Sequence, residues 1–258
     1  MQPLAKIDNY SFTAIPIEPL YDETKLAIGT AFFWLHQKQN FLITNWHNLS
    51  GRRTDDEKPI HSQAAIPNKL RIWCGHETVG NKISTDVDLY DKDGTPIWFV
   101  HPTRKHAVDI AAIAITPGYD VRIYAINDAQ ETPAIVGVGA EVFILGFPTG
   151  LTRGGFPIWK RGSIATEPDF AAQGDDYMLI DSATRAGMSG APVIFRTNGT
   201  FTAQDGSINI AAGANTSFVG IYSGRLKTPT LDDPQLGITW PKKLIEEVVA
   251  GGVRDTAI

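Results

Sequence analysis

Short apolar stretches separated by turn-forming residues make up most of the chain. They are rich in Ile, Val, Phe, Tyr and Trp and are bounded by Gly, Pro, Asn or Asp, which is the pattern of β-strands. The Asp93-Gly94 pair between two of them indicates a hairpin turn. We predict strands near residues 27–36, 40–44, 69–74, 87–90, 97–100, 110–116, 142–146, 158–164, 177–181, 191–195, 217–222 and 235–239.

A single segment near the C-terminus has the spacing of an amphipathic helix. Its apolar side chains recur three or four positions apart, at Leu244, Ile245, Val248 and Val249. Pro241 suits the first helical position, where a missing N–H breaks no hydrogen bond, and Gly251-Gly252 ends the helix. We therefore predict a helix with Pro241 in its first turn.

This distribution of elements predicts an all-β protein of the sandwich or barrel type with a C-terminal α-helix. An α/β barrel would need a helix after nearly every strand, and a repeat fold would need a sequence period of about 20–50 residues. Neither pattern is present. About six strands fall on each side of residues 120–133, so we expect two six-stranded units in tandem.

The composition is that of a folded protein without a basic surface. Of the 258 residues, 43% are hydrophobic and 20% are charged, which excludes wholesale disorder. The net charge of −5 argues against nucleic acid as a partner, and no apolar run reaches the ~18 residues of a membrane span. The N-terminus lacks a signal-peptide core and Cys74 is the single cysteine, so we expect a reducing, cytoplasmic location. The histidines are too scattered for a zinc site, and we expect neither metal nor cofactor.

Three local patterns carry residues with catalytic chemistry. His47 follows the exit of an apolar strand, Asp109 precedes another apolar strand, and Ser189 stands between Gly187 and Gly190. A serine hydroxyl is a poor nucleophile until an imidazole takes its proton, and a carboxylate fixes the tautomer of that imidazole. The two glycines allow a tight turn in which the amides of Gly187 and Ser189 point at one spot, where an oxyanion can sit.

Each of these residues also has a plain structural interpretation. A lone His47 would more often cap a strand end, a lone Asp109 would belong to a turn, and Ser189 between glycines could be a tight turn only. Asp86 and Asp88 compete with Asp109 for the acid because they also neighbour a strand, but neither begins an Asp-Ile-Ala run. The combination of all three patterns on an all-β background favours catalysis.

The residues around these positions resemble the signature blocks of trypsin-like serine proteases, the chymotrypsin fold, in their HtrA-like intracellular branch. The blocks are Thr44-Asn45-Trp46-His47, Asp109-Ile110-Ala111 and Gly187-Met188-Ser189-Gly190-Ala191-Pro192, in the order of that family. The resemblance implies two six-stranded antiparallel β-barrels packed side by side, followed by a C-terminal α-helix. It places residues 1–125 in the first barrel with its N-terminal extension, and residues 126–258 in the second barrel with the helix.

The resemblance also implies an activity, that of a serine endopeptidase acting on protein or peptide substrates. In that family Ser189 would be the nucleophile, His47 the base, Asp109 the residue that orients it, and Gly187 with Ser189 the oxyanion hole. Met188 stands where secreted trypsins carry an aspartate, so activation by a freed N-terminus is not expected. A protease without a pro-segment needs restraint in a cytoplasm, and we expect a regulatory protein partner, ligand or oligomer that orders the cleft.

The family's primary pocket predicts the cleavage specificity. Ala183 lies six residues before Ser189, at the base of that pocket, which argues against a preference for Arg or Lys. The segment from Thr184 is similar to that of picornavirus-type and glutamyl endopeptidases, although Tyr222 stands where those have a histidine. We expect Glu, Gln or Asp before the cut, with small apolar residues as the alternative. The expected substrate-binding residues are Ala183, Thr184, Tyr222, Ser223, Gly224 and Arg225.

Two other functions remain open at this point. A catalytically silent double barrel could bind extended peptides or act as a scaffold, but such proteins usually lose one member of the triad and this chain keeps all three. A small-molecule esterase would share the nucleophile and leave peptides uncut.

Overall fold

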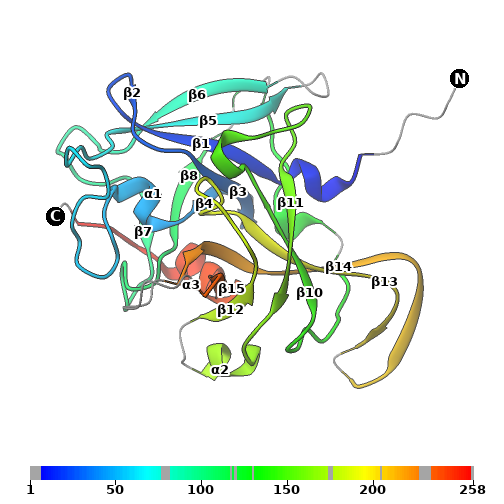
Figure 1. Ribbon diagram of the computed structural model, residues 1–258. Helices are drawn as coiled ribbons and strands as arrows, with labels where there is room; N and C mark the ends of the chain where they lie inside the picture. Colours follow the sequence, from blue (N-terminus) through cyan, green and yellow to red (C-terminus); the bar gives the residue numbers. More distant parts are fainter. Residues whose placement is uncertain are drawn as a thin grey trace, which may run out of the picture.

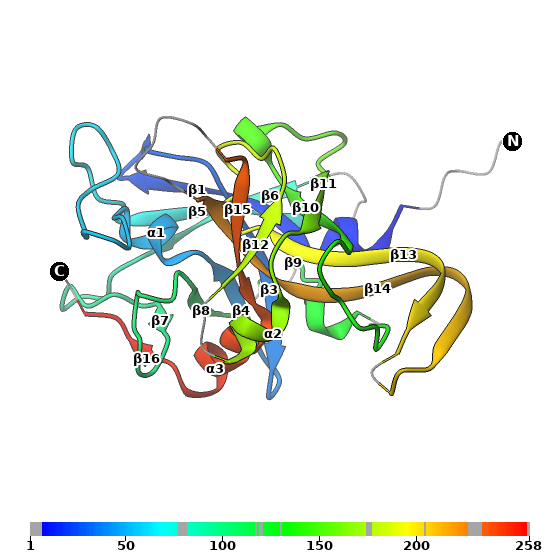
Figure 2. The ribbon, with the colours of Figure 1, turned by 60° about the horizontal axis from the view of Figure 1, so that its bottom comes forward.

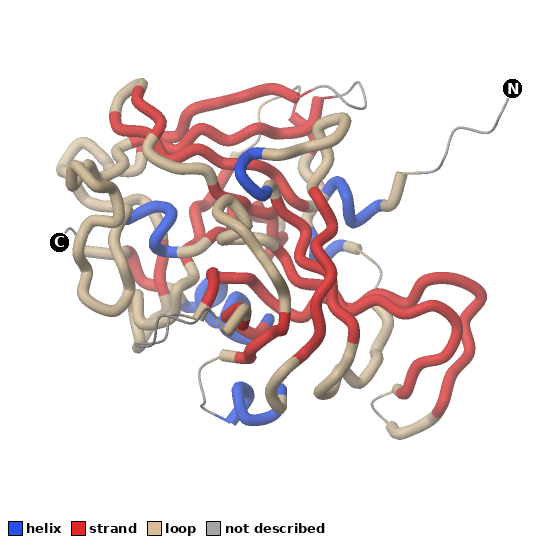
Figure 3. Tube along the Cα trace, in the orientation of Figure 1, coloured by secondary structure: helices blue, strands red, loops and turns tan. Residues whose placement is uncertain are grey.

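The computed structural model describes residues 7–76, 82–116, 118, 121–129, 131–173, 177–203, 205–226 and 234–256. Strands predominate in these ranges and form two antiparallel β units, with a helix near the C-terminus packed against both (Figures 1 and 3). The predicted all-β class with a double-barrel arrangement and C-terminal helix is confirmed. None of the described helices is long and apolar enough to cross a membrane.

The first unit contains ten described strands in one sheet. Their order is β16-β7-β8-β4-β3-β1-β5-β6, with β2 added to β1 and β9 added to β5. The bounds are β1 (Ala14–Tyr21), β2 (Thr24–Lys25), β3 (Gly29–His36), β4 (Gln39–Thr44), β5 (Lys69–His76), β6 (Lys82–Asp88), β7 (Phe99–Val100), β8 (Ala111–Ile115), β9 (Val121–Arg122) and β16 (Val253–Arg254).

The second unit is a closed barrel of six strands, as expected, in the order β10-β11-β12-β15-β14-β13. Its interior is filled by side chains such as Val142, Ile144, Ile180 and Val193. The bounds are β10 (Glu141–Gly146), β11 (Ile158–Ile164), β12 (Met178–Asp181), β13 (Pro192–Thr202), β14 (Ile208–Arg225) and β15 (Leu236–Pro241). The first unit thus differs from the expected six strands because four two-residue strands extend its sheet.

Helical elements are short and lie at the ends of strands. They are η1 (Asn9–Phe12), α1 (Trp46–Ser50), η2 (Ile126–Asp128), η3 (Pro148–Gly150), α2 (Pro168–Gln173) and α3 (Lys242–Gly251). The expected C-terminal helix is α3, but Pro241 is its N-cap with extended backbone (φ −66°, ψ 152°) and not its first helical residue. The apolar face of α3 packs with side chains of both units, including Val108, Ile110 and Ile194.

Strand β3 explains how the two units share a core. Phe33 points into the cluster inside the first unit, whereas its neighbours Phe32 and Trp34 belong to the cluster shared with the second unit. Alternation of side chains along a strand therefore buries both faces of β3. This double burial accounts for the uninterrupted apolar run Ala31-Phe32-Phe33-Trp34.

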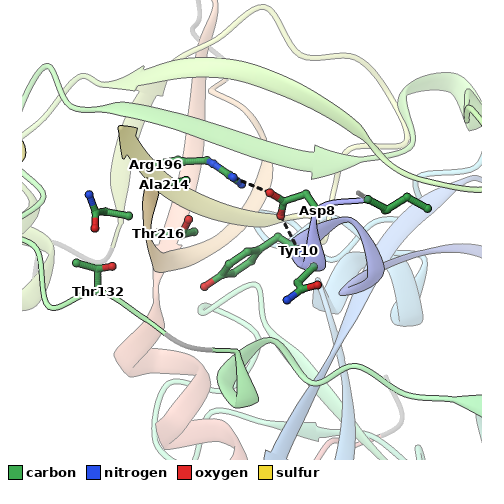
Figure 4. Close-up of a pocket in the computed structure, with 9 residues that line it drawn as sticks. Asp8, Tyr10, Thr132, Arg196, Ala214 and Thr216 are labelled. Atoms are coloured by element: carbon green, nitrogen blue, oxygen red, sulfur yellow. Dashed lines mark hydrogen bonds and ion pairs between the residues drawn. The ribbon is translucent and has the colours of Figure 1, made fainter. Parts of the chain in front are cut away.

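The hairpin of β13 and β14 extends beyond the second barrel (Figure 2). Beside its base, a cavity of about 420 Å³ separates the hairpin from η1 (Figure 4). Arg196 forms an ion pair with Asp8 across it at 2.6 Å. Burial, followed by the nearby acids Glu131 and Asp8, raises the pKa of Tyr10 to about 12. This polar cavity contains none of the expected catalytic or substrate-binding residues.

Candidate active site

His47 lies in α1, directly after β4 delivers the chain to the junction of the two units. Asn45 is the extended N-cap of α1, and its side-chain amide donates to the carbonyl of Asp109 at 2.7 Å. Gly51 ends the helix in the left-handed conformation (φ 65°), and its N–H donates to the His47 carbonyl at 3.1 Å. The helix is a single short turn, so these contacts with the rest of the protein decide where the His47 ring points.

Asp109 precedes β8 and holds His47 through both carboxylate oxygens. Oδ1 accepts the backbone N–H of His47 at 3.0 Å, and Oδ2 lies 2.7 Å from His47 Nδ1. The Asp109 side chain is 5% exposed and that of His47 is 20% exposed. Because an ionised carboxylate only accepts hydrogen bonds, Nδ1 carries the ring hydrogen and Nε2 is left as the proton acceptor.

The charge of this pair is set by competing effects. Burial raises the pKa of Asp109, but the His47 imidazole and the hydrogen bonds from His47 and Ser223 outweigh that effect. The pKa of Asp109 therefore lies below its usual value, and the group is a carboxylate at neutral pH. Such a group can orient an imidazole and stabilise its protonated form.

Ser189 lies in a tight turn between β12 and β13 that needs glycine at two positions. Gly187 and Gly190 have φ values of +92° and +86°. A Cβ at Gly190 would lie 2.0 Å from the Thr30 carbonyl oxygen, and one at Gly187 would lie 2.3 Å from that of Phe147. No other residue fits both the backbone conformation and the space.

The backbone around Ser189 is fixed through its carbonyl groups. Thr30 donates its hydroxyl to the Gly187 carbonyl at 2.7 Å and its N–H to the Ser189 carbonyl at 2.8 Å. The Asn48 amide, from α1, donates to the same Ser189 carbonyl at 3.2 Å. Within the described residues, no group accepts the N–H of Gly187 or of Ser189. Two amides beside one hydroxyl are thus able to stabilise an oxyanion.

Ser223 connects the acid to the candidate nucleophile. Its hydroxyl donates to Asp109 Oδ2, and its carbonyl accepts from Ser189 Oγ at 3.4 Å. A Cβ at Gly224 would lie 3.8 Å from Ser189 Oγ, so this strand passes directly beside the hydroxyl. Among the described residues, no hydrogen bond joins Ser189 Oγ to the His47 ring. Asp109, His47 and Ser189 therefore share one site, with the hydroxyl turned toward Ser223.

The expected pocket residues divide into buried and accessible ones. Thr184 and Tyr222 are each 1% exposed, and their hydroxyls are hydrogen-bonded to each other. A Cβ at Gly237 would lie 2.4 Å from the Tyr222 ring, which therefore fills the space beside β15. Ala183 is partly buried and Arg225 is exposed. A register shift between Tyr222 and Gly224 interrupts the β14–β15 pairing at Ser223 and directs its side chain to Asp109.

The competing acids lie elsewhere. Asp86 and Asp88 are on exposed positions of β6, and Asp86 accepts a bidentate pair of hydrogen bonds from Arg71 at 2.7 and 2.8 Å. The roles of Thr30 and Asn48 in fixing the Ser189 turn, and the bond from Ser223 to Asp109, were not predicted from the sequence. The available signal was a threonine inside the otherwise apolar β3, directly after Gly29.

The sequence itself matches a known protein family. The model of the trypsin-like peptidase domain matches residues 29–203, a range that includes His47, Asp109 and Ser189. The chain belongs to the trypsin-like peptidase family. Such a peptidase is a hydrolase of the serine-protease kind. None of the curated proteins compared with this chain matches it.

Solved structures share the fold of this trypsin-like peptidase at low sequence identity. The serine endoprotease from Yersinia pestis is similar with a TM-score of 0.50 and 12% identity, over 96% of this chain and 67% of that one. The Rv3671c protease from M. tuberculosis, in its active form, has a TM-score of 0.47 and 17% identity, over 96% of this chain and 84% of that one. The similarity to the Yersinia protein shows only the fold of this peptidase, and not its activity.

Proposed function

We propose that this trypsin-like peptidase is a serine endopeptidase that uses a triad of Ser189, His47 and Asp109. The observation that carries the proposal is the buried, ionised Asp109 bound to both His47 and Ser223, with Ser223 in turn bound to Ser189. A buried carboxylate is costly to maintain. Here it is aligned on an imidazole, which it orients so that the imidazole can accept a proton. The trypsin-like peptidase family supports the same chemistry.

Catalysis begins when Ser189 Oγ attacks the carbonyl carbon of the scissile bond. The hydroxyl proton moves to His47 Nε2, and the carbonyl π electrons move onto oxygen, where the N–H groups of Gly187 and Ser189 stabilise the negative charge. His47 then donates its proton to the leaving amine, the C–N bond breaks, and an acyl-enzyme forms. Water then attacks that ester while His47 takes its proton, the bond from the acyl carbon to Ser189 Oγ breaks, and His47 returns the proton to Ser189 Oγ as the carboxylic acid product leaves.

The Ser189 hydroxyl must first rotate from the Ser223 carbonyl toward His47. The need for this rotation supports regulation, because the Ser189 hydroxyl donates to the Ser223 carbonyl at 3.4 Å the proton that His47 would have to accept. We propose that substrate, or a regulatory protein partner, shifts the hydroxyl into line. Rapid cleavage of casein by the isolated protein would contradict the need for a partner.

The residues expected around the primary pocket support a specificity different from that of trypsin. Ala183 carries no acid, Thr184 and Tyr222 are buried with their neutral hydroxyls hydrogen-bonded to each other, and Arg225 lies at the exposed edge. We propose Glu, Gln or Asp before the cut, with small apolar residues as the alternative. The substrate would add a strand through main-chain hydrogen bonds at Ser223 and Gly224 of β14, because residues 220–222 already pair with both β13 and β15. A peptide-library profile dominated by Arg or Lys would contradict both versions.

Labelling with a fluorophosphonate tests the nucleophile directly. The intact protein should take up one label at Ser189, and Ser189→Ala should take up none. Peptide cleavage by protein that has not been labelled, and its loss after labelling, identifies an endopeptidase; an esterase would take up the label but leave peptides intact in both samples. A protein that stays unlabelled, with and without added partners, would be a silent double barrel.

A further inference from the structure

Asp255 is a buried carboxylate that lies outside the proposed catalytic groups. It is 5% exposed, and its Oδ2 accepts hydrogen bonds from two indole nitrogens, Trp46 Nε1 at 2.6 Å and Trp98 Nε1 at 3.0 Å. Its Oδ1 accepts the Thr256 N–H at 3.0 Å. Both indole rings are buried as well, at 0% and 2% exposure. The arrangement satisfies a charge and two donors that would each be costly to bury alone.

The chain reaches this position by returning from the second unit to the first. After α3, Val253 and Arg254 form β16, which pairs with β7 of the first sheet (Figure 2). The Arg254 guanidinium donates to the Pro96 carbonyl at 2.6 and 2.9 Å and forms an ion pair with Asp91 at 3.0 Å. The Asp255 N–H then donates to the Trp98 carbonyl at 3.1 Å. These bonds hold Asp255 beside Trp46, the first residue of α1.

Trp46 links this anchor to the proposed base, because it immediately precedes His47 in α1. Its ring is also stacked on His106, with centroids 4.8 Å apart and planes 26° apart. The Nε2 atom of His106 in turn lies 2.9 Å from Oε1 of Glu57. A five-residue helix has little stability of its own, so fixing the Trp46 ring fixes the backbone from which His47 projects.

We propose that Asp255 is a positioning residue for His47, acting through the hydrogen bond to Trp46. The proposal rests on the proposed function of His47 as the base. Asp109 aligns the His47 ring from one side, and Asp255 holds the preceding residue from another. Without Asp255 the short helix α1 shifts, and the His47 ring leaves the position from which Nε2 can reach Ser189. Errors in position of about 1 Å can cost about a hundredfold in rate.

Kinetics of Asp255→Asn and Trp46→Phe, alone and combined, test the proposal. Active sites are counted by fluorophosphonate labelling of a separate aliquot, so that the kcat of the untreated sample is expressed per reactive, folded site. We expect kcat per labelled site to fall about tenfold in each single variant, with KM changed less than about twofold. Trp46→Phe removes the indole donor, and Asp255→Asn replaces the charged acceptor with a weaker neutral one, so both changes act on one hydrogen bond. The double variant should therefore fall no further than Trp46→Phe alone. Asp93→Asn, the same change at an exposed carboxyl, is the matched control and should leave kcat unchanged.

Two outcomes overturn the positioning role. An unchanged kcat per labelled site in Asp255→Asn would show that the carboxylate serves stability only. Additive losses in the double variant would show that the two residues act separately. If Asp255→Asn fails to fold, Trp46→Phe carries the test, because in that variant Asp255 keeps its bond to Trp98.

A spectroscopic readout separates this proposal from the proposed function. The proton on His47 Nδ1, held by Asp109, gives a hydrogen resonance that can be followed without turnover. Asp255→Asn should broaden it by exchange with solvent, whereas Asp93→Asn should not; an unchanged resonance overturns the proposal. A wild-type protein that takes up no fluorophosphonate would refute the proposed function, while this resonance would still report whether Asp255 positions His47.

Discussion

At the scale of single residues, Ser223 contacts two neighbours, one through its side chain and the other through its main chain. Its hydroxyl is committed to Asp109, and only its carbonyl is available to Ser189. Asp109 therefore receives the Ser223 hydroxyl as well as both hydrogen bonds from His47, and this explains a lowered pKa in a fully buried carboxyl. The charge of Asp109, rather than its size, is the property on which the site depends.

Asp109→Asn should abolish most activity without unfolding the protein. The amide keeps the shape of the carboxyl but can donate to His47 Nδ1, which selects the wrong tautomer and leaves Nε2 protonated. We expect kcat to fall about 10⁴-fold, measured by peptide cleavage at neutral pH. Asp86→Asn, on β6, should stay within a factor of about two, and comparable losses in both variants would contradict the assignment.

Alanine substitutions at two glycines separate two costs to stability, that of a strained backbone and that of a Cβ placed too close to its neighbours. Gly190 and Gly199 have nearly equal φ values, +86° and +88°, but a Cβ would lie 2.0 Å from Thr30 at the first and meet nothing within 4 Å at the second. Gly199→Ala should cost about 1 kcal/mol of unfolding free energy. Gly190→Ala should cost about 3–5 kcal/mol and remove fluorophosphonate labelling. Equal urea midpoints for the two variants would rule out the close contact.

At the scale of elements, the turn-bounded apolar strands were predictable and the interrupted ones were not. Strand β1 was missed because Pro16 and Pro19 interrupt its pattern. Pro16 pairs with β3 and Pro19 pairs with β5, so each proline has a ladder partner on one side only, and its missing N–H interrupts no ladder on the other side. Residues 197–202 are largely polar, and they nevertheless continue β13 as a strand that pairs with β14. Their cross-strand pairing decides this, and local composition does not contain it.

The candidate site was predictable to the extent that it depends on local spacing. His47, Asp109 and Ser189 each stand in a short motif with a chemical reason for its residues, and the fold brings all three to one site. The supporting contacts of Thr30, Asn48 and Asp255 join segments 140 to 210 residues apart in sequence. Such contacts depend on the closure of both β units, and apart from the lone threonine in β3 they have no local signature.

Helix α3 is the element that couples the two units. Ile245 is fully buried in the cluster that also contains Val108 of the first unit and Ile194 of the second. Ile245→Ala should lower the unfolding free energy by about 2–5 kcal/mol. Near-ultraviolet circular dichroism and tryptophan fluorescence should show one coincident transition, at a lower urea concentration. Glu246→Ala, exposed on the same helix, should change stability by less than about 0.5 kcal/mol, and separate transitions for the two units would contradict the shared core.

At the scale of the whole molecule, a set of ionised carboxyls links stability to pH. Hydrogen bonds from Arg71, Thr95 and Ser207 lower the pKa values of Asp86, Asp91 and Asp205 respectively. In Asp109, burial acts in the opposite direction but is outweighed by His47. Each group binds protons more weakly in the folded state than in the unfolded one, where the pKa is about 3.9.

The stability that these groups provide is therefore fully present above about pH 4 and is lost as the pH falls through their folded pKa values. We expect the urea midpoint to be nearly constant from about pH 7 to 5 and to decrease steeply between about pH 4 and 2. Asp86→Asn removes one such group, so its midpoint should start lower at pH 7 and decrease less on acidification. A wild-type midpoint that stays constant down to pH 2 would mean that these carboxyls titrate alike in both states, and that the Asp109 charge is not held by its surroundings.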